Sequence, residues 1–333
     1  MKYVFGPVPS RRLGQSLGID PVPLKTCNWN CVYCQLGRTK PLINERKEYI
    51  DSSDILFQVK ESLHAHKPGE IDWVTFIGSG ETCLHANLGF MISEVKKMTT
   101  LPVAVITNGS LLYLPEVREE LMAADAVLPS LDAGNESLYR KINRPHPGLT
   151  FQRLVSGLKS FRDTYTGKLW VEVMLVKGLN DSESVLCEIA LLLNDIRPDE
   201  VHILQPTRPP VELWVQPADK ESLKHAQKII GETAKVILPA TGSFDLDTNV
   251  NLVDEIINII TRHPMRETEL IETLIHWYSG DVREIIAELT KSGRAQKVLR
   301  NGVEFWSAAP SYFPEITKKS DAVPSNTSSS TKD

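Results

Sequence analysis

Three cysteines near the N-terminus have the residue type and the spacing of a metal-binding loop. Cys27, Cys31 and Cys34 form a C-x3-C-x2-C pattern within residues 26–36. Thiolates this close together are soft ligands that suit zinc or an iron–sulfur cluster. A cubane cluster has four irons, so three cysteines would leave one iron without a protein ligand. Such an open iron could bind a small molecule, which would make the loop more than a carrier of electrons.

The same loop is open to two other interpretations. Zinc would need a fourth ligand, and His85 in a later loop is a candidate. Cys31 and Cys34 could instead form a thioredoxin-like redox pair, but this interpretation leaves Cys27 unexplained.

The composition is that of a soluble globular protein. The chain has 333 residues, 41% of them hydrophobic and 24% charged, and a formal net charge of −5. This length suits one large domain and a smaller one, and the charge gives no general attraction to nucleic acid or to anionic membranes. Because no apolar run could span a bilayer and no signal region is recognisable, we expect a cytoplasmic protein without membrane association. Of the remaining cysteines, Cys83 stands alone, and Cys187 is predicted to be buried in an apolar helical pattern.

Apolar strand-like runs alternate with amphipathic helical patterns over residues 1–240. The strands are predicted at residues 16–21, 73–77, 103–107, 126–131, 169–176 and 201–205. The helices are predicted at residues 52–64, 87–98, 115–122, 151–162, 182–194 and 219–232. Continuous apolar strands separated by helices indicate a parallel sheet built from βα units. Six such units predict an α/β domain folded as a partial (β/α)6 TIM-like barrel, although an open doubly wound sheet would give the same local pattern.

Residues 250–309 have a different pattern and predict a small second domain. Helices are expected at residues 252–262, 267–277 and 281–292, followed by strands at residues 295–298 and 303–306 around an Asn301-Gly302 turn. Three helices and a β-hairpin resemble a winged-helix domain, with Trp277, Phe305 and Trp306 in its core. Residues 314–333, rich in Ser, Thr, Lys and Asp, are predicted to be a disordered tail.

Polar residues follow the predicted strands, at the end where ligands gather in parallel βα architectures. They are Gly78, Ser79, Gly80 and Glu81 after the second strand, Asn108 and Gly109 after the third, Ser130 and Asp132 at the fourth, Glu172 within and Lys177 after the fifth, and Gln205 and Arg208 after the sixth. Two glycines let a backbone approach a ligand closely, and the Glu81 carboxylate could accept hydrogen bonds from an ammonium group. The alternative is that all of these are ordinary turn residues.

Together these features resemble the radical S-adenosylmethionine (SAM) superfamily. The resemblance rests on the cysteine pattern with Tyr33 directly before the last cysteine, and on residues 78–81 in the place of that superfamily's Gly-Gly-Glu motif. It covers roughly residues 5–240. Residues 6–14 and 174–181 are similar to the wyosine-synthase-related iron–sulfur oxidoreductases of the superfamily. One departure is that Thr82 and Cys83 follow the motif glutamate, where a proline is expected.

The resemblance implies two cofactors and a radical mechanism. Cys27, Cys31 and Cys34 would hold a [4Fe–4S] cluster, and SAM would chelate its fourth iron through amino and carboxylate groups. One electron from the reduced cluster would cleave the sulfonium C–S bond, giving methionine and a 5′-deoxyadenosyl radical that abstracts a substrate hydrogen. A low-potential donor such as flavodoxin or ferredoxin would supply the electron.

The resemblance also assigns residues at the strand ends to SAM. They are Tyr33 for the adenine, Gly78, Gly80 and Glu81 for the methionine ammonium, Asn108, Ser130 and Asp132 for the ribose and carboxylate, and Glu172 and Lys177 further in. Gln205 and Arg208 would face the substrate or the adenine. His202 is predicted to be an interior histidine without a ligand role.

The sequence does not identify the substrate. A tRNA base is the expectation from the family, and a peptide or a small metabolite is the alternative within the same class. Arg11 and Arg12 could hold an anionic substrate or could pair with carboxylates. A non-catalytic iron–sulfur regulator that binds DNA through the winged helix is a hypothesis of another class, and a zinc-stabilised structural protein is a third.

Nucleic-acid binding would depend on a local basic edge of the small domain. That edge consists of Lys291, Arg294, Lys297 and Arg300. Residues 252–308 as a whole contain nine acidic and seven basic residues, which is a poor balance for binding phosphates. The helix at residues 281–292 is also less basic than a recognition helix should be. A solvated face is therefore the alternative interpretation of the basic edge.

Overall fold

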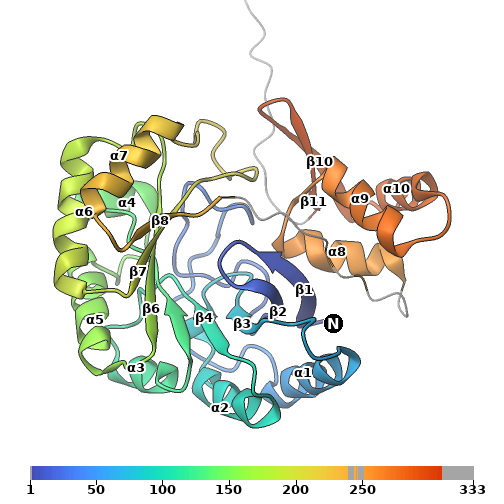
Figure 1. The fold of residues 1–333 in the computed structure, drawn as a ribbon, viewed down its shortest axis with the longest axis horizontal. Helices are drawn as coiled ribbons and strands as arrows, with labels where there is room; N and C mark the ends of the chain where they lie inside the picture. The colour runs from blue at the N-terminus through green and yellow to red at the C-terminus, as the bar shows by residue number, and fades with distance from the viewer. Residues whose placement is uncertain (1, 239–243, 245, 247–250, 310–333) are drawn as a thin grey trace, which may run out of the picture.

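A computed structural model describes residues 2–238, 244, 246 and 251–309 of the chain. The large sheet in this part of the chain has eight strands, which lie in chain order (Figure 1). They are β1 (Val4–Ser10), β2 (Gly14–Ile19), β3 (Trp73–Ile77), β4 (Val103–Ile106), β5 (Ala126–Leu128), β6 (Lys168–Met174), β7 (Glu200–Leu204) and β8 (Ala234–Val236). β1 is antiparallel to β2, and each later strand is parallel to the one before it. The prediction of an α/β partial barrel is confirmed.

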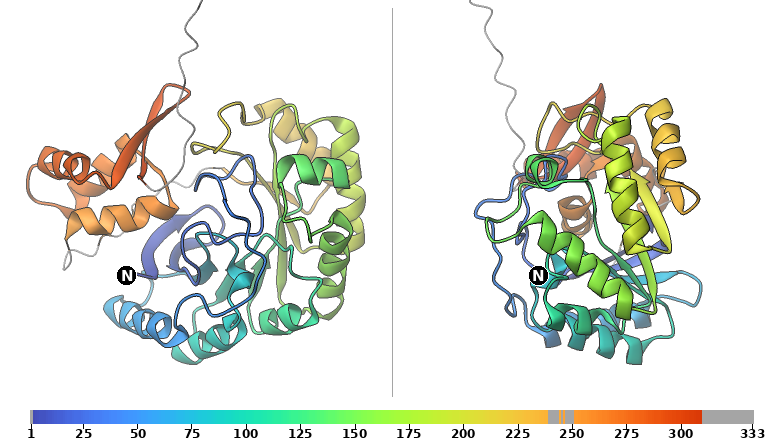
Figure 2. Two further views of the ribbon diagram at one scale, coloured as in Figure 1. Left: turned by 180° about the vertical axis from the view of Figure 1, so that it is seen from behind. Right: turned by 90° about the vertical axis from the view of Figure 1, so that its left-hand side faces the viewer.

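Helices cover the convex face of this curved sheet (Figures 1 and 2). They are α1 (Ser52–Ala65), α2 (Leu88–Met98), α3 (Pro115–Leu121), α4 (Glu136–Ile142), α5 (Phe151–Thr164), α6 (Glu183–Ile196) and α7 (Lys220–Ile230), with a short 3-10 helix, η1 (Thr82–Leu84). Side chains cap several of these helices, as Asp51 does for α1 and Asp219 for α7. These caps satisfy backbone N–H groups that have no partner within the helix.

All six predicted strands are present, but the prediction missed β1, β8 and α4. β1 contains Gly6, Pro7 and Pro9, which read as a loop in the sequence. Proline is tolerated in a strand at the edge of a sheet, where a missing N–H group leaves no neighbour unpaired. β1 is such an edge strand, and its register with β2 is irregular between Phe5 and Val8. β8 has only three residues, which is too short for a periodic signal.

The strands alternate between the two faces of the sheet. Val74 and Phe76 of β3 are fully buried in the main core between the sheet and its helices. Trp73, one position away from Val74, belongs to a smaller cluster on the concave face. On that face the Ser16 and Thr75 hydroxyl groups form a hydrogen bond of 2.7 Å. We call the side of the sheet that this face lines the lumen.

The prediction that Cys187 is buried is wrong. α6 buries Leu186, Ile189, Ala190, Leu193 and Ile196. This 3.6-residue period leaves Cys187 on the other side of the helix, where it is exposed. His202 is buried as predicted, with its Nε2 2.9 Å from the Glu200 carboxylate.

The C-terminal part of the described chain has three helices and a small sheet. They are α8 (Leu252–Arg262), α9 (Glu267–Trp277) and α10 (Val282–Lys291), with strands β9 (Met265–Arg266), β10 (Ala295–Arg300) and β11 (Val303–Ala308) in the order β10–β11–β9. α8 and α9 have the predicted bounds, and Phe305 and Trp306 are buried as expected. Assignment to the winged-helix class remains a prediction, and the predicted disordered tail lies outside the described residues.

The C-terminal part packs against the edge of the large sheet, where α8 lies beside β1 (Figure 1). Phe5 and Val8 of β1 are buried in one apolar cluster with Ile256 of α8. Lys2 and Glu255 form an ion pair of 2.7 Å across the same boundary. None of the helices in the described residues is long and apolar enough to cross a membrane.

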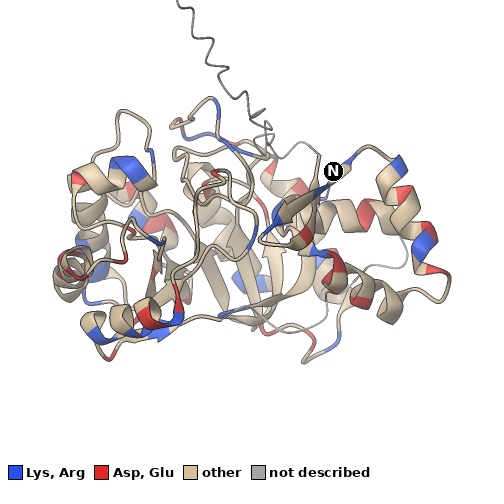
Figure 3. Cartoon of the chain, turned by 90° about the horizontal axis from the view of Figure 1, so that it is seen from above, with Lys and Arg blue, Asp and Glu red and all other residues tan. Residues whose placement is uncertain are grey.

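Most of the predicted basic edge is neutralised or buried. Arg294 pairs with Asp254 at 2.5 Å, and Lys297 pairs with Glu267 at 2.7 Å. Arg300 is buried and donates a hydrogen bond of 2.9 Å to a backbone carbonyl group of the large domain. Positive and negative residues are interspersed along the C-terminal helices (Figure 3). This edge therefore resembles the solvated alternative more than a phosphate-binding surface.

Candidate functional site

The cysteine loop begins beyond the end of β2, and its three thiols are half-buried and close together. Burial, followed by the charges of Cys27 and Cys34, raises the pKa of Cys31 well above its ordinary value. No three His, Cys, Asp or Glu side chains in the described residues are placed to hold a single metal ion. In a cubane cluster the cysteine ligands bind different irons, so the thiols need not converge on one point.

Each of the three sulfur atoms lies near a nitrogen donor of the chain. The Lys25 ammonium is 3.3 Å from the Cys34 sulfur, and the Trp29 backbone N–H is 3.4 Å from the Cys27 sulfur. The Asn143 amide lies 3.7 Å from the Cys31 sulfur. Hydrogen bonds to sulfur orient thiolate ligands and tune the reduction potential of iron–sulfur clusters. The donor set thus fits the [4Fe–4S] group that the sequence predicts.

Sequence reasoning missed these three donors. Lys25 and Trp29 lie within two residues of a cysteine, so proximity to the motif was an available signal. Asn143, the residue after α4, had no such signal because α4 itself was not predicted. Its amide also donates to the Asp132 carboxylate at 2.7 Å, which fixes its position.

The loop at residues 78–81 packs directly against the cysteine loop. The Lys25 N–H donates to the Ser79 carbonyl at 2.6 Å, and the Glu81 N–H donates to the Thr26 carbonyl at 2.8 Å. A Cβ atom on Gly80 would lie 1.8 Å from that Thr26 oxygen. Glycine at this position is therefore required by the close approach of two backbones.

We expect Gly80→Ala to separate the two loops. The added methyl group cannot be accommodated without moving the backbone directly before Cys27, so iron content after reconstitution and SAM binding should both fall at least about tenfold. Iron analysis and equilibrium dialysis with labelled SAM measure these effects. Gly148→Ala is the matched control, because the nearest atom to its new Cβ would be 3.4 Å away. Normal iron content and SAM binding in Gly80→Ala would show that the contact is not needed.

Thr82, which stands where a proline was expected, has a clear local role. Its hydroxyl group accepts a hydrogen bond from the Gly78 N–H and donates one to the Ile106 carbonyl, both at 2.9 Å. A threonine thus closes the loop by hydrogen bonds. Cys83 follows it in η1, where it is buried and its thiol lies 3.4 Å from the Thr107 hydroxyl.

Glu81 is buried and joins the ends of two strands. Its carboxylate accepts hydrogen bonds from the Cys83 N–H at 2.9 Å, the Thr107 hydroxyl at 2.5 Å and the Asn108 N–H at 2.7 Å. Burial raises the pKa of Glu81, and these three donors oppose the shift. The Cys83 side chain is a further donor that opposes it, so the carboxylate is held firmly between the loop after β3 and the loop after β4.

Asn108 lies against the cysteine loop. Its amide donates to the Asn28 side chain at 2.7 Å, and the Asn28 amide donates to the Ser110 hydroxyl at 2.9 Å. His85, the proposed fourth ligand in the zinc interpretation, is engaged elsewhere: its ring nitrogens contact the Ile50 carbonyl and the Asn87 N–H.

Tyr33 and Asp132 are joined by a hydrogen bond of 2.5 Å from the tyrosine hydroxyl to the carboxylate. Asp132 also accepts from the Met174 N–H at 2.8 Å, so it links the cysteine loop to the end of β6. Burial raises the pKa of Asp132, with Tyr33 the leading opposing donor. Ser130 is half-buried beside Glu172, to which it is joined by a parallel bridge.

The last two residues that were predicted to bind SAM, Glu172 and Lys177, differ in burial. Glu172 is buried on β6 and forms an ion pair with Arg12. Lys177 was predicted to lie further in, but it lies in the turn that follows β6. Its ammonium is 3.5 Å from Asp219, and 57% of its side chain is exposed.

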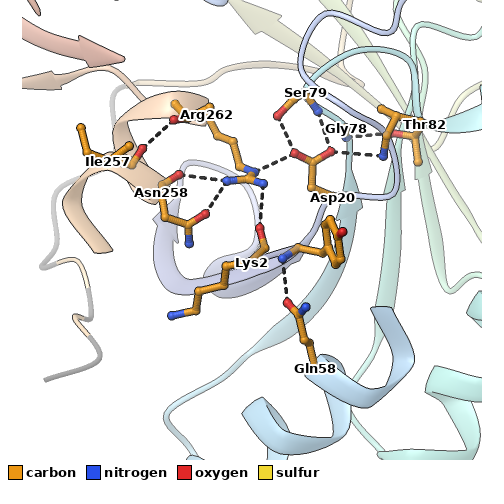
Figure 4. A network of polar contacts seen from close by, with 12 residues as sticks. Lys2, Asp20, Gln58, Gly78, Ser79, Thr82, Ile257, Asn258 and Arg262 are labelled. Carbon is orange, nitrogen blue, oxygen red and sulfur yellow. Dashed lines mark hydrogen bonds and ion pairs between the residues drawn. The ribbon is translucent and has the colours of Figure 1, made fainter. Parts of the chain in front are cut away.

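Asp20 connects this site to the C-terminal part of the chain (Figure 4). Its carboxylate accepts from the Ser79 N–H at 2.8 Å and from the Ser79 hydroxyl at 2.5 Å. It also pairs with the Arg262 guanidinium of α8 at 2.7 Å. The Arg262 carbonyl in turn accepts from the side chain of Gln35, next to Cys34, at 2.9 Å.

The family model described as "Radical SAM superfamily" matches residues 22–189, which is half of the chain and includes the cysteine loop and residues 78–81. The chain belongs to the radical SAM superfamily. As a radical SAM enzyme it uses a [4Fe–4S] cluster and SAM, the cofactors of that superfamily.

Relatives span most of this radical SAM chain. The UPF0026 protein MJ1312 of Methanocaldococcus jannaschii is 34% identical, over 92% of this chain and 96% of that protein. A protein of Brachyspira hyodysenteriae named GTPase Obg is 37% identical, over 91% of this chain but only 44% of its own length. A solved radical SAM methyltransferase from Sphaerobacter thermophilus has the same fold, with a TM-score of 0.52, 17% identity and 66% of each chain covered.

Proposed function

We propose that Cys27, Cys31 and Cys34 hold the [4Fe–4S] cluster and that the strand-end residues beside them bind SAM, so that a hydrogen atom is abstracted from a substrate in the lumen. The observation that supports this assignment best is the close packing of residues 78–81 on the cysteine loop. When bound, the two cofactors supply a 5′-deoxyadenosyl radical, while the chain supplies orientation and exclusion of water.

The side chains around the thiols have distinct positioning roles in this proposal. Lys25, Trp29 and Asn143 each direct a donor at one sulfur, which fixes the three ligands and lowers the cost of negative charge on the cluster. Gly80 and Glu81, which pack against the backbone directly before Cys27, are placed to meet the methionine ammonium of SAM. The hydroxyl–carboxylate bond to Asp132 fixes the ring of Tyr33 beside the cluster, where an adenine could pack.

The proposed substrate is a small molecule that enters the lumen. The family resemblance made a tRNA base the expectation, and nucleic-acid contact would depend on the basic edge of the small domain. Two of the cations at that edge are paired with carboxylates, and Arg300 is directed into the protein. The concave face, by contrast, presents buried charged and polar side chains, among them Glu172 and Arg12.

Formation of 5′-deoxyadenosine tests this proposal. The chain is reconstituted with iron and sulfide without oxygen, reduced with dithionite and incubated with SAM, and products are separated by chromatography. We expect 5′-deoxyadenosine and methionine in equal amounts, at a slow rate without substrate. A preparation with a full complement of iron that forms neither product would refute the proposal.

A further inference from the structure

Arginine side chains accumulate beside the lumen, and the proposed SAM site does not use them. Arg11 and Arg12 lie in the turn between β1 and β2, and Arg208 follows β7. Burial, then the charges of Arg11 and Arg208, lowers the pKa of Arg12 to about 9. Burial and then Arg11 likewise lower the pKa of Arg208 to about 10. The charges of the three guanidinium groups, two from the β1–β2 turn and one from the segment after β7, therefore act on one another.

Carboxylates compensate only part of this positive charge. Arg12 pairs with Glu172, and the neighbouring cations Arg262 and Arg266 have Asp20 and Glu269 as partners. Among the described residues, neither Arg11 nor Arg208 has a carboxylate within ion-pair distance. His263 adds no charge, because burial and then the charge of Arg208 hold its pKa well below the usual range. Arg11 and Arg208 therefore have no ion-pair partner in the described part of the chain, although the charge of Glu269 acts on Arg208 from a longer distance.

The same arginines have buried donor atoms without acceptors. The Arg11 Nη1 and Arg12 Nε atoms are inaccessible to solvent and have no hydrogen-bond partner in the described part of the chain. Arg208 is only partly satisfied, by the Pro264 carbonyl at 3.0 Å and the Gln35 side chain at 3.4 Å. Buried donors in native proteins are nearly always paired, so these groups lack an acceptor that a ligand could provide.

The position of the cluster relates it to the reaction site. Gln35, which accepts from Arg208, is the neighbour of Cys34. Val211, three residues after Arg208, donates its N–H to the Cys34 carbonyl at 3.0 Å. Glu172, the partner of Arg12, lies on β6 two residues before Met174, whose N–H is bonded to Asp132. Arg208 therefore lies beside the cysteine loop, and Arg12 reaches toward it through Glu172.

We propose that Arg11, Arg12 and Arg208 bind a phosphate monoester group of the substrate. A guanidinium group presents a planar pair of donors that matches phosphate oxygens, and a phosphate monoester carries about two negative charges at neutral pH. Two such charges suit Arg11 and Arg208, neither of which forms an ion pair within the described residues. The inference rests on the proposed function, since it gives the small substrate in the lumen a phosphorylated end.

Titration calorimetry with inorganic phosphate tests this inference on the reconstituted, SAM-loaded chain. The wild type should bind phosphate, and Arg11→Gln should weaken binding at least about tenfold, because hydrogen bonds to a charged group are lost. Arg283→Gln is the matched control, since Arg283 lies on α10 with 90% of its side chain exposed. Acetate is the probe for a carboxylate in place of a phosphate.

A second variant should shift affinity in the opposite direction. Glu172→Gln removes the carboxylate that opposes an anion, so phosphate should bind several-fold more tightly. No phosphate binding by the wild type, equal binding of acetate, or equal affinity in Arg11→Gln would each overturn the inference. If the wild type forms 5′-deoxyadenosine but does not bind phosphate, only this inference is refuted. If it forms no 5′-deoxyadenosine, the proposed function is refuted.

Discussion

Cys31→Ala should abolish formation of 5′-deoxyadenosine. The two other cysteines of the described chain cannot replace a lost ligand, since Cys83 is buried beside Thr107 and Cys187 is exposed on α6. Mutation of a partner that merely orients a metal ligand costs about 10- to 100-fold, so loss of the ligand itself should exceed that range. Chromatography of the products and the visible absorbance of the cluster measure the effect.

Cys187→Ala is the control for this experiment. It removes a thiol of the same chemistry from a position remote from the loop, so iron content and product formation should equal those of the wild type. Normal product formation in a well-folded Cys31→Ala variant would contradict the assignment of the ligands. Loss of product in both variants would point to a general effect of thiol removal. That result would also contradict the assignment of the ligands.

Asp20→Ala should destabilise the chain by about 3 to 5 kcal/mol, the cost of breaking a buried ion pair by removing one partner. Asp20 is 2% exposed, and its loss leaves the Arg262 guanidinium and the Ser79 donors without their acceptor. Since Ser79 belongs to the loop that packs on the cysteines, SAM affinity should fall as well. Urea denaturation of the variant and the wild type measures the change in stability.

Asp254→Ala is the matched control for Asp20→Ala. It also breaks an aspartate–arginine pair of the C-terminal part, but the pair with Arg294 is exposed and should contribute less than about 1 kcal/mol. Equal stability losses in the two variants would show that the Asp20 network has no special role. A decrease of less than about 1 kcal/mol in the free energy of unfolding of Asp20→Ala would contradict the stabilising role of the Asp20–Arg262 ion pair between α8 and the site.

The sequence was informative where a pattern repeats. Strand β3 has the predicted bounds because it is a continuous apolar run, and helices α8 and α9 have them because their apolar residues keep a helical period. β1 was missed because its prolines resemble a loop, and only the position at the sheet edge makes them acceptable. Cys187 was misplaced because neighbouring apolar residues suggested burial, whereas the helical period decides it.

The site was only partly predictable for a different reason. Glu81 and Asn108 were found because they directly follow strands, and parallel strands bring such residues together. Asn143 and Asp20 could not be found, because their roles come from partners about a hundred or more residues away, Cys31 and Arg262. Lys177 also follows a strand, but it lies in the turn after β6, where its side chain is exposed.

The electron paramagnetic resonance spectrum of the reduced, reconstituted wild type, recorded with and without SAM, tests the central claim most directly. If three cysteines hold the cluster and leave one iron open, SAM will bind that iron and change the spectrum, in a preparation with about four irons per chain. A spectrum that is unchanged at saturating SAM would contradict the claim that the fourth iron of this cluster is open to SAM.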